Sequence, residues 1–530
     1  MNGSMSIGTK EIEDNEVTAS YVKKLEPRLL GLAERLAARG LDEASLLRAG
    51  TSGFRGRNNE ELVRNIVAYS VALGELLGQR KTVIVGYDRR PGSTHNALLC
   101  AVILKYSNVA TMITESPTTI SCLAKTVSES NIERATEEFF GVMCGASHNP
   151  LTDNGMNFIM PDGSIAEEDY TDQLAERALK IDFKPSSRTR EGQAEIRIIN
   201  PTQNYVNSIV EFAGVVSQRD LVVVVDPLNG AGKNVLPDLV GSLGVTCHMV
   251  QRNGFEGMID LDPRNNLEHI KKEMKKRNAD LGVLIDGDGD RVMFVYPRIV
   301  KDRTIVEEAD FNEAFAATLE FLIGKLPVHA VSTNVASSTM FRDICRTYGL
   351  NIYDRNPVGF KYQSRDMRLN PDQVVVGIEG NSGGFTVSSF SHEKDGCLAA
   401  AVAIRMVAET GSLADIIDHL RKKYGRRYTQ ETNVHTSNLP TRENRRAVIE
   451  SLKKEFKAGH VFCQKKIVDV ITVDGIKLNF ADGSSLLIRA SGTEPKFRVV
   501  PEVKVERETK MLSEAAKRIL ELASLTYNVN

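Results

Sequence analysis

The stretch Asp286-Gly-Asp-Gly-Asp-Arg291 places three carboxylates at alternate positions and ends in an arginine. Apolar runs at residues 281–285 and 292–296 flank it, and they predict two short buried strands joined by a tight loop. Three carboxylates in so small a loop repel one another strongly unless a cation lies between them. Hard oxygen ligands without a nearby His or Cys favour Mg²⁺ over zinc or copper, and the glycines let the oxygens converge. The segment therefore predicts a magnesium site formed by Asp286, Asp288 and Asp290.

Two other interpretations of this loop are weaker. An EF-hand loop also begins D-x-D-x-D, but it requires glycine at its sixth position and glutamate at its twelfth. The chain has Arg291 and Pro297 at those positions, which excludes an EF-hand. A solvated acidic turn is the second alternative. The apolar strands on both sides count against it, because they carry the loop to the edge of a core.

Length and composition describe a multidomain globular protein. At 530 residues the chain is expected to form roughly three to five domains. The net charge of −2 gives no general attraction to nucleic acid or to an anionic membrane. The 7 cysteines lack any C-x-x-C pair, which suits reduced thiols in the cytoplasm. The longest apolar run, residues 397–408, is interrupted by Arg405 and is too short to span a membrane, and the polar residues 1–16 are expected to be a disordered leader rather than a signal peptide.

Much of the chain alternates apolar strands, polar or glycine-rich loops and amphipathic helices, which predicts α/β layers with buried strands. Such strands are expected at residues 82–85, 221–225 and 328–331. A helix is expected at residues 61–77, ending at Gly78.

Domain boundaries are expected where the composition becomes polar, at residues 184–197, 297–310 and 421–430. The basic run 421–427 is interpreted as a solvated helix end or linker rather than a nucleic-acid site. Beyond it, strands are expected at residues 486–488 and 497–500, followed by a closing helix at 507–525.

A second candidate site is the loop Gly145-Ala-Ser-His-Asn-Pro150, which follows a stretch, residues 135–140, that we expect to be helical. The small residues Gly145 and Ala146 leave Ser147 accessible, and Pro150 fixes the exit of the loop. Ser147 and His148 do not form a hydrolase triad, because neighbouring side chains on an extended loop point apart and no G-x-S-x-G elbow is present. Taken alone, the loop is more typical of a turn.

Together, the two loops and two later motifs resemble those of the α-D-phosphohexomutase family. That family carries a phosphoserine loop, a magnesium loop, a sugar loop and a phosphate loop, in this order. The sequence has Ser147-His-Asn-Pro150, Asp286 to Arg291, Gly377-Ile-Glu-Gly-Asn-Ser-Gly-Gly384 and Arg489-Ala-Ser-Gly-Thr-Glu-Pro495. Supporting motifs are Gly50-Thr-Ser-Gly-Phe-Arg-Gly56, Asn154-Gly155, Asp226-Pro-Leu-Asn-Gly-Ala-Gly232, Asn356-Pro-Val-Gly-Phe-Lys361 and Lys394-Asp-Gly396. The resemblance extends from about residue 50 to about residue 500.

The resemblance implies three similar α/β domains with mixed sheets between helices, plus a smaller C-terminal α+β domain, around a central cleft. The domains are expected at residues 1–198, 199–305, 306–428 and 429–530. The implied activity interconverts hexose 1-phosphate and hexose 6-phosphate, of glucose, mannose or both. It uses a phosphoserine enzyme, Mg²⁺ and hexose 1,6-bisphosphate as intermediate and activator. The expected enzyme is a monomer or homodimer whose partner is the sugar phosphate, with no nucleic acid and no membrane.

The resemblance also assigns roles to residues. Ser147 is the phosphorylated residue, and one oxygen of its phosphate joins Asp286, Asp288 and Asp290 around the metal, with Asp290 also at the substrate. Arg55 reaches the phosphoserine, and Arg291 supports the metal loop or contacts the substrate. The hydroxyl-reading and phosphate-binding residues are Lys361, Glu379, Asn381, Ser382, Arg489, Ser491, Gly492, Thr493 and Arg498. Arg489, Ser491, Gly492 and Thr493 are expected to form an anion nest. The alternative is that this segment is a plain Gly-Thr turn between strands.

The sequence departs from the family pattern at three places. Gly145 stands where the family accepts threonine, and the sugar loop has one residue more than G-E-E-S, which affects the register of Asn381. Asn157 stands where many members have a lysine thought to move protons, and asparagine cannot act as a base. His148 and Lys394 remain as candidate general bases. For His148, orienting the serine loop is an equally good interpretation.

Other activities remain open at this point. A phosphoglucosamine or phosphoacetylglucosamine mutase is one alternative, although Gly384 replaces a histidine usual in the bacterial glucosamine enzymes. A catalytically weak sugar-phosphate-binding protein is another, since Asn157 removes a proton carrier. A phosphatase is disfavoured, because it would not need a second phosphate site.

Overall fold

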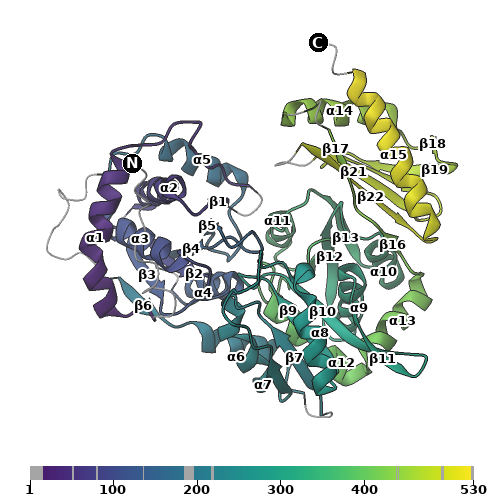
Figure 1. Ribbon diagram of the computed structural model, residues 1–530, viewed down its shortest axis with the longest axis horizontal. Helices are drawn as coiled ribbons and strands as arrows, with labels where there is room; N and C mark the ends of the chain where they lie inside the picture. Colours follow the sequence, from purple (N-terminus) through teal and green to yellow (C-terminus); the bar gives the residue numbers. More distant parts are fainter. Residues whose placement is uncertain are drawn as a thin grey trace. The chain divides into compact units, whose positions relative to one another are not determined.

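The computed structural model describes residues 16–50, 53–78, 81–134, 136–183, 196–216, 220–436, 439, 441–490 and 495–526 (Figure 1). The chain divides into two compact units. Unit 1 comprises residues 1–309 and 383–414, and unit 2 comprises residues 310–382 and 415–530.

The first sheet of unit 1 is mixed and has the order β1-β5-β4-β2-β3-β6. Its strands are β1 (Phe54–Arg57), β2 (Lys81–Tyr87), β3 (Ala110–Thr114), β4 (Glu138–Cys144), β5 (Asp153–Ile159) and β6 (Arg197–Ile199). Its helices are α1 (Ala19–Ala37), α2 (Glu60–Leu77), α3 (Ser93–Tyr106), α4 (Ile120–Glu133) and α5 (Glu168–Ala178). Strands β2, β3, β4 and β6 are parallel, whereas β1 and β5 pair antiparallel at one edge.

Both faces of this sheet are buried, as strand β2 shows. Successive residues of a strand point to opposite faces of the sheet. Val83 and Val85 of β2 pack with the apolar residues of α2 and α3, while Ile84 packs with those of α4. All three side chains are at most 1% exposed. This explains the continuous apolar run that the sequence shows here.

The second sheet of unit 1 has the order β11-β10-β9-β7-β8. Its strands are β7 (Val222–Asp226), β8 (Thr246–Met249), β9 (Leu281–Ile285), β10 (Val292–Val300) and β11 (Arg303–Glu308). The remaining elements of the unit are α6 (Thr202–Ala213), α7 (Leu236–Ser242), α8 (Leu267–Arg277), β15 (Gly384–Val387), α12 (Gly396–Thr410) and two short 3₁₀ helices, η4 (Ala231–Asn234) and η5 (Pro263–Asn265). Strands β9 and β10 are antiparallel neighbours, so the acidic stretch is the turn between them.

Unit 2 contains two sheets. Strands β12 (Val328–Asn334), β13 (Asn351–Asn356) and β14 (Val374–Glu379) form the parallel part of the first, in the order β13-β12-β14. The helices that accompany them are α9 (Phe311–Ile323), α10 (Met340–Tyr348), α11 (Lys361–Leu369) and α13 (Leu413–Tyr424). This part of unit 2 repeats the α/β pattern of unit 1.

The last sheet is antiparallel, with the order β16-β22-β21-β20-β19-β18 and with β17 paired to β22. Its strands are β16 (Tyr428–Thr429), β17 (Thr432–His435), β18 (Val461–Phe462), β19 (Lys465–Ile471), β20 (Ile476–Phe480), β21 (Ser485–Ala490) and β22 (Lys496–Val503). Helices α14 (Arg442–Glu455) and α15 (Arg507–Thr526) pack against it, and one apolar cluster joins strands and helices (Figure 1). The chain thus has three α/β domains and a smaller C-terminal α+β domain, which confirms the expected fold class.

The predicted strands and helices are confirmed at most positions. The helix expected at residues 61–77 is α2, and Gly78 ends it with φ = 65°. The expectation of a helix at residues 135–140 is wrong, because Glu138, Phe139 and Phe140 begin β4. Phe139 and Phe140 are buried in different apolar clusters, so they point to opposite faces of the sheet. Burial on both faces overrides the local helix preference of this segment.

Two of the polar segments that were expected to mark domain boundaries can be compared with the structure. Residues 297–308, expected to mark a boundary, belong to the hairpin of β10 and β11, and the division between the units follows at Ala309. Of the polar segment 184–197, residues 184–195 lie outside the described residues, as do residues 1–15.

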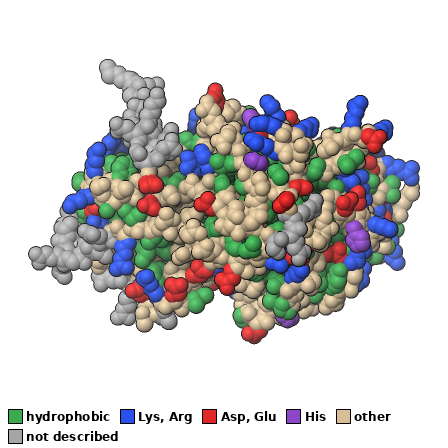
Figure 2. Space-filling model, turned by 90° about the horizontal axis from the view of Figure 1, so that it is seen from below, with side chains coloured by type: hydrophobic (Ala, Val, Ile, Leu, Met, Phe, Trp, Pro, Cys, Tyr) green, Lys and Arg blue, Asp and Glu red, His purple; other side chains and the backbone are tan. Residues whose placement is uncertain are grey.

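On one face of the molecule, basic and acidic side chains are interspersed with apolar ones (Figure 2). Among the described residues, no single helix has the length and apolar character needed to span a membrane, and α12 and α13 pass that test only as a pair bent by 85°.

The packing of β1 makes a prediction for stability. The ring of Phe54 is 1% exposed and stacks on Tyr69 of α2 with the centroids 4.5 Å apart. Phe54→Ala should lower the free energy of unfolding of unit 1 by ~3–5 kcal/mol, because it leaves a cavity beside Tyr69. Phe54→Leu, the control, should cost less than ~1.5 kcal/mol. Scanning calorimetry measures both, and equal small losses for the two variants would contradict this packing.

Candidate active site

Ser147 lies in unit 1, in the loop that follows β4, and its side chain is fully buried. Its φ of 50° lies in the left-handed region, which non-glycine residues adopt rarely and often at functional sites. The hydroxyl oxygen donates to Oδ2 of Asp286 at 2.7 Å. The structure therefore brings together the serine loop and the acidic loop, 139 residues apart in the sequence.

The three carboxylates of the acidic loop form one cluster. Asp286, Asp288 and Asp290 each offer an oxygen within 4.8 Å of the others, and their exposed fractions are 0%, 1% and 3%. Within the described part of the chain, neither oxygen of Asp288 has a hydrogen-bond partner. Buried anions without partners are costly, so this donor set fits a hard divalent cation such as Mg²⁺.

The pKa values of these groups reflect the crowding. Burial, reinforced by the charge of Asp290, raises the pKa of Asp286 to about 6. Burial and the charges of Asp290 and Asp286 raise the pKa of Asp288 well above its usual range, although Arg55 and Lys394 oppose this rise. A bound cation would lower both pKa values, because its charge favours the ionised carboxylates and offsets their repulsion.

Two glycines allow the loops to approach closely. A Cβ atom on Gly287 would lie 2.6 Å from the carbonyl oxygen of Ser147. Gly289 has φ = 77°, and a Cβ there would lie 2.5 Å from Cγ2 of Thr119. A side chain at Gly287 would push the acidic loop away from the serine loop, and one at Gly289 would push it away from the start of α4, which explains the alternation of aspartate and glycine.

Three cationic residues predicted for the site also lie in unit 1. Nζ of Lys394 is 3.0 Å from Oδ2 of Asp290. The backbone N–H of Arg291 donates to Oδ1 of Asp286 at 3.1 Å. Arg55, in β1, donates to Oδ1 of Asn149 in the serine loop at 3.1 Å. The cluster is thus surrounded by positive charge, as a site for phosphate transfer requires.

The position of Lys394 depends on the start of helix α12. The side chain of Asp395 caps this helix by accepting from the backbone N–H of Leu398 at 2.8 Å. The same oxygen accepts from the hydroxyl of Tyr205 at 2.7 Å. Burial raises the pKa of Asp395 to about 6.

The geometry of His148 bears on its role. Its Nδ1 lies 3.2 Å from the hydroxyl oxygen of Ser147, and its Nε2 lies 3.4 Å from Nη1 of Arg291. A guanidinium can only donate, so Nε2 accepts and Nδ1 carries the proton toward Ser147. Burial and the nearby charges of Arg291, Arg55 and Lys394 lower the pKa of His148 far below its usual range. A neutral imidazole that donates toward the serine fits an orienting role better than that of a base.

Sequence reasoning missed two residues that hold the serine loop. The guanidinium of Arg90 donates to the backbone carbonyls of Ser147, Pro150 and Asp153, and its Nε lies 3.0 Å from Oδ2 of Asp88. Both charged side chains are fully buried. The sequence does contain a pattern that could have indicated them. Asp88 and Arg90 follow the buried strand β2 closely, where an isolated charge would be unfavourable.

The sugar-loop residues lie in unit 2, at the end of β14. Asn334, at the end of β12, donates to Oε1 of Glu379 at 3.3 Å and to Oδ1 of Asn381 at 3.1 Å. The sequence did not single out Asn334. The hydroxyl of Ser382 is buried and has no partner among the described residues, and the side chain of Lys361 is buried at the start of α11. Hydroxyls of a sugar are suitable partners for these groups.

The predicted phosphate-binding arginines lie on adjacent strands of the last sheet. Arg489 of β21 and Arg498 of β22 are direct cross-strand partners. Like charges in this arrangement repel, and a shared anion would stabilise them. Ser491, Gly492 and Thr493 lie outside the described residues, so their role in the anion nest stays a prediction.

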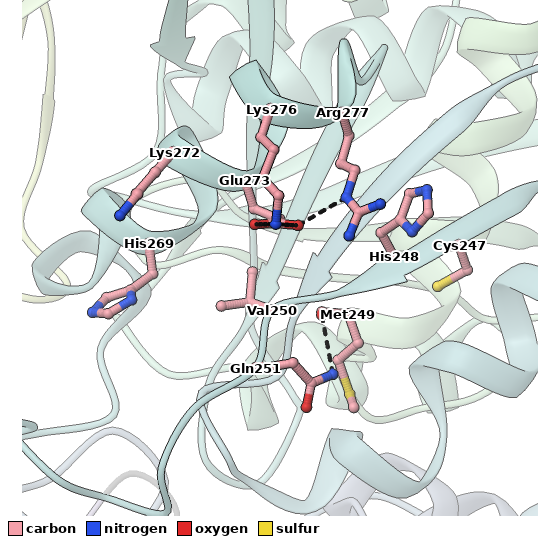
Figure 3. A pocket seen from close by; sticks show the side chains of 10 residues that line it. All are labelled: Cys247, His248, Met249, Val250, Gln251, His269, Lys272, Glu273, Lys276 and Arg277. Atoms are coloured by element: carbon pink, nitrogen blue, oxygen red, sulfur yellow. Dashed lines mark hydrogen bonds and ion pairs between the residues drawn. The ribbon is translucent and has the colours of Figure 1, made fainter.

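A surface pocket of about 470 Å³ between β8 and α8 contains none of the predicted residues (Figure 3). Its basic residues Lys276 and Arg277 pair with Glu273, and Lys272 and His269 extend from the same helix. No group in it resembles a catalytic constellation, so the acidic cluster remains the candidate active site.

Comparison with known proteins agrees with this geometry. Models of the phosphoglucomutase/phosphomannomutase family match along the chain: α/β/α domain I at residues 47–185, domain II at 203–299, domain III at 310–424 and the C-terminal domain at 431–518. The chain belongs to this family. The resemblance inferred from the four motifs is thereby confirmed.

Relatives of the chain differ in their substrates. A phosphoglucomutase/phosphomannomutase of Thermococcus kodakarensis is 29% identical over 493 residues, covering 89% of this chain and 98% of its own. A phosphoglucosamine/phosphogalactosamine mutase of Sulfurisphaera tokodaii is 26% identical over 501 residues, covering 89% and 98%. A solved family protein of Burkholderia thailandensis has the same fold, with a TM-score of 0.71 and 19% identity over 91% of this chain and 98% of its own.

The raised pKa values predict how metal binding depends on pH. In the metal-free cluster the pKa of Asp286 is raised to about 6, and that of Asp288 is raised well above its usual range. Mg²⁺ must displace the protons of these carboxyl groups, so its affinity should rise with pH and fall steeply below about pH 6. Isothermal titration calorimetry from pH 5 to pH 8 measures this dependence. Asp288→Asn should weaken binding at least tenfold at pH 8, and unchanged affinity would exclude Asp288 as a ligand.

Proposed function

We propose that the protein is a hexose-phosphate mutase that interconverts hexose 1-phosphate and hexose 6-phosphate of glucose, mannose or both. The observation that carries this proposal is the hydroxyl of Ser147, fully buried and 2.7 Å from a carboxylate of a three-aspartate cluster. A phosphate on Ser147 would adjoin that cluster and would be shielded from water. Such shielding favours transfer to a sugar over hydrolysis.

The residues that would hold Mg²⁺ are Asp286, Asp288, Asp290 and the phosphorylated Ser147. When bound, the ion supplies positive charge that stabilises the transferring phosphoryl group. Arg55 acts on the same group as a fixed cation, and Lys394 lies beside it, 3.0 Å from Asp290. Arg291 fixes the end of the acidic loop through its backbone contact with Asp286.

The proposed cycle moves one phosphoryl group to the sugar and recovers another. The bond between the Ser147 oxygen and phosphorus breaks, and a bond from phosphorus to a sugar hydroxyl oxygen forms. The proton of the sugar hydroxyl passes to a base, and the departing Ser147 oxygen takes up a proton to become a hydroxyl again. The product is a hexose 1,6-bisphosphate, which then returns its other phosphoryl group to Ser147 after turning over. His148 is assigned the orienting role, since its Nδ1 proton faces Ser147. Lys394 is then the proposed proton carrier in place of Asn157.

Recognition of sugar hydroxyls and of phosphate is assigned to residues of unit 2 in this proposal. Glu379, Asn381 and Ser382 bind sugar hydroxyls, with Lys361 beside them. Arg489, Ser491, Gly492, Thr493 and Arg498 bind the phosphate that is not being transferred. We assign these functions to four domains at residues 1–198, 199–305, 306–428 and 429–530, which carry the serine, metal, sugar and phosphate loops.

Phosphoglucosamine mutase is the second candidate. The phosphoglucosamine/phosphogalactosamine mutase of Sulfurisphaera tokodaii, 26% identical, supports it, whereas Gly384, in place of a histidine, counts against it. Glucose and glucosamine differ only at C2, where glucosamine has an amine in place of the hydroxyl. Comparing kcat/KM for the 1-phosphates of glucose, mannose and glucosamine decides between the candidates, and glucosamine preferred by tenfold or more would overturn the first.

Ser147→Ala tests the covalent step. The variant should lose turnover by at least a thousandfold, because the sugar has no phosphoryl donor, while it should still bind glucose 1-phosphate within about threefold of wild type. Intact-protein mass spectrometry should find phosphate on wild-type Ser147 and none on the variant. A variant that retains a tenth of the activity, or an active wild type that never carries phosphate, would contradict the proposal.

A further inference from the structure

Asp474 of unit 2 has no role in the proposed cycle. It contacts a residue of the predicted phosphate site and the loop that precedes the sugar-binding residue Lys361. It lies in the turn between β19 and β20. Its Oδ2 accepts from Nη2 of Arg489 at 2.8 Å and from the backbone N–H of Val358 at 3.2 Å. One carboxylate oxygen therefore joins the phosphate-binding arginine to the loop that precedes Lys361.

The next residue of that loop makes the matching contact. The backbone N–H of Gly359 donates to Oε1 of Glu379 at 3.1 Å. Two consecutive amides, those of Val358 and Gly359, thus bind two carboxylates, one beside the phosphate site and one in the sugar loop. Asn334 extends the connection from Glu379 to Asn381.

The turn that carries Asp474 is fixed against Arg489. Gly475 has φ = 91°, and a Cβ there would lie 2.8 Å from Cα of Arg489 and 2.2 Å from the carbonyl oxygen of Ile488. Backbone this close leaves little freedom for the carboxylate to move relative to the arginine. The Nε of Arg489 is buried and has no partner among the described residues, so Asp474 holds one end of the guanidinium and leaves Nε for another acceptor.

Charge gives Asp474 a second effect. Arg489 and Arg498 lie directly opposite each other on β21 and β22, and they repel when no phosphate is bound. A carboxylate paired with Arg489 offsets that repulsion. It keeps the guanidinium in place between rounds of binding.

We propose that Asp474 is a positioning residue that sets the phosphate-binding Arg489 at a fixed distance from the sugar-reading Glu379. It acts through the amides of Val358 and Gly359. A sugar phosphate is then recognised by the spacing between its non-transferring phosphate and its ring hydroxyls. The inference rests on the proposed function, because it assumes that both groups bind one sugar phosphate.

A double-mutant cycle tests this proposal. Glucose 1-phosphate binding is measured by calorimetry in the Ser147→Ala background, where no turnover occurs. Asp474→Ala should raise Kd about tenfold, which is the loss expected for a charged hydrogen bond. Because Asp474 acts through Arg489, adding Asp474→Ala to Arg489→Ala should change Kd by less than twofold. An equal tenfold loss in both backgrounds, or no loss in either, would overturn the proposal.

Matched variants separate positioning from general structure. Asp469 pairs with Arg355 at 3.0 Å and also joins β19 to β13, so Asp469→Ala removes a comparable ion pair away from Arg489. It should leave Kd unchanged, and a loss equal to that of Asp474→Ala would overturn the positioning role. Asp474→Asn keeps an oxygen for Val358 and should raise Kd only two- to fivefold, which provides the test if the alanine variant fails to fold.

Kinetics in the phosphorylatable enzyme give a further readout. Asp474→Ala should raise KM about tenfold and lower kcat less than threefold, because the contact is made equally in the ground and transition states. A fall confined to kcat would overturn the proposal. Wild-type binding without turnover would contradict the proposed mutase function alone, whereas no binding of glucose 1-phosphate by the parent would overturn both.

Discussion

Electrostatic repulsion among three buried carboxylates constrains the architecture of unit 1. Asp286, Asp288 and Asp290 each offer a carboxylate oxygen within 4.8 Å of the others, on a turn between two buried strands. Burying one unpaired carboxylate is already unfavourable, and burying three together requires a compensating cation. The surrounding arginines and Lys394 supply part of that compensation. The oxygens of Asp288, which have no hydrogen-bond partner among the residues that the structure describes, mark where a cation would bind in the cluster that includes the hydroxyl partner of Ser147, Asp286.

The polar residues of unit 2 follow a different principle. Asp474, Glu379 and Asn334 each have hydrogen-bond partners, and two consecutive backbone amides lie between the two carboxylates. Satisfied networks of this kind fix the spacing of side chains that must meet a ligand. The aspartate cluster of unit 1 thus concentrates buried charge suited to chemistry, whereas the network of Asp474, Glu379 and Asn334 in unit 2 orders groups suited to recognition. A mutase needs both properties, since it must move one phosphoryl group while it holds another.

The sequence predicts the fold where local pattern and tertiary burial agree. Strands β9 and β10, helix α2 and its end at Gly78 follow from periodicity and glycine placement. The prediction of a helix at residues 135–140 was wrong because Phe139 and Phe140 are buried on opposite faces of a sheet, which only the tertiary structure reveals. Arg90, Asn334 and Asp474 escaped notice for a related reason. Their roles depend on partners distant in the sequence, and no short motif encodes such a partner.

We propose that a phosphate on Ser147 would share one metal ion with the three aspartates. Electron–nuclear double resonance on the phosphorylated protein, with Mn²⁺ in place of Mg²⁺, measures this directly through the coupling between the metal and ³¹P. We expect a strong ³¹P coupling, typical of a phosphate oxygen bound to the metal, that disappears in Ser147→Ala. Tight Mn²⁺ binding that depends on Asp288 but shows no ³¹P coupling would contradict it.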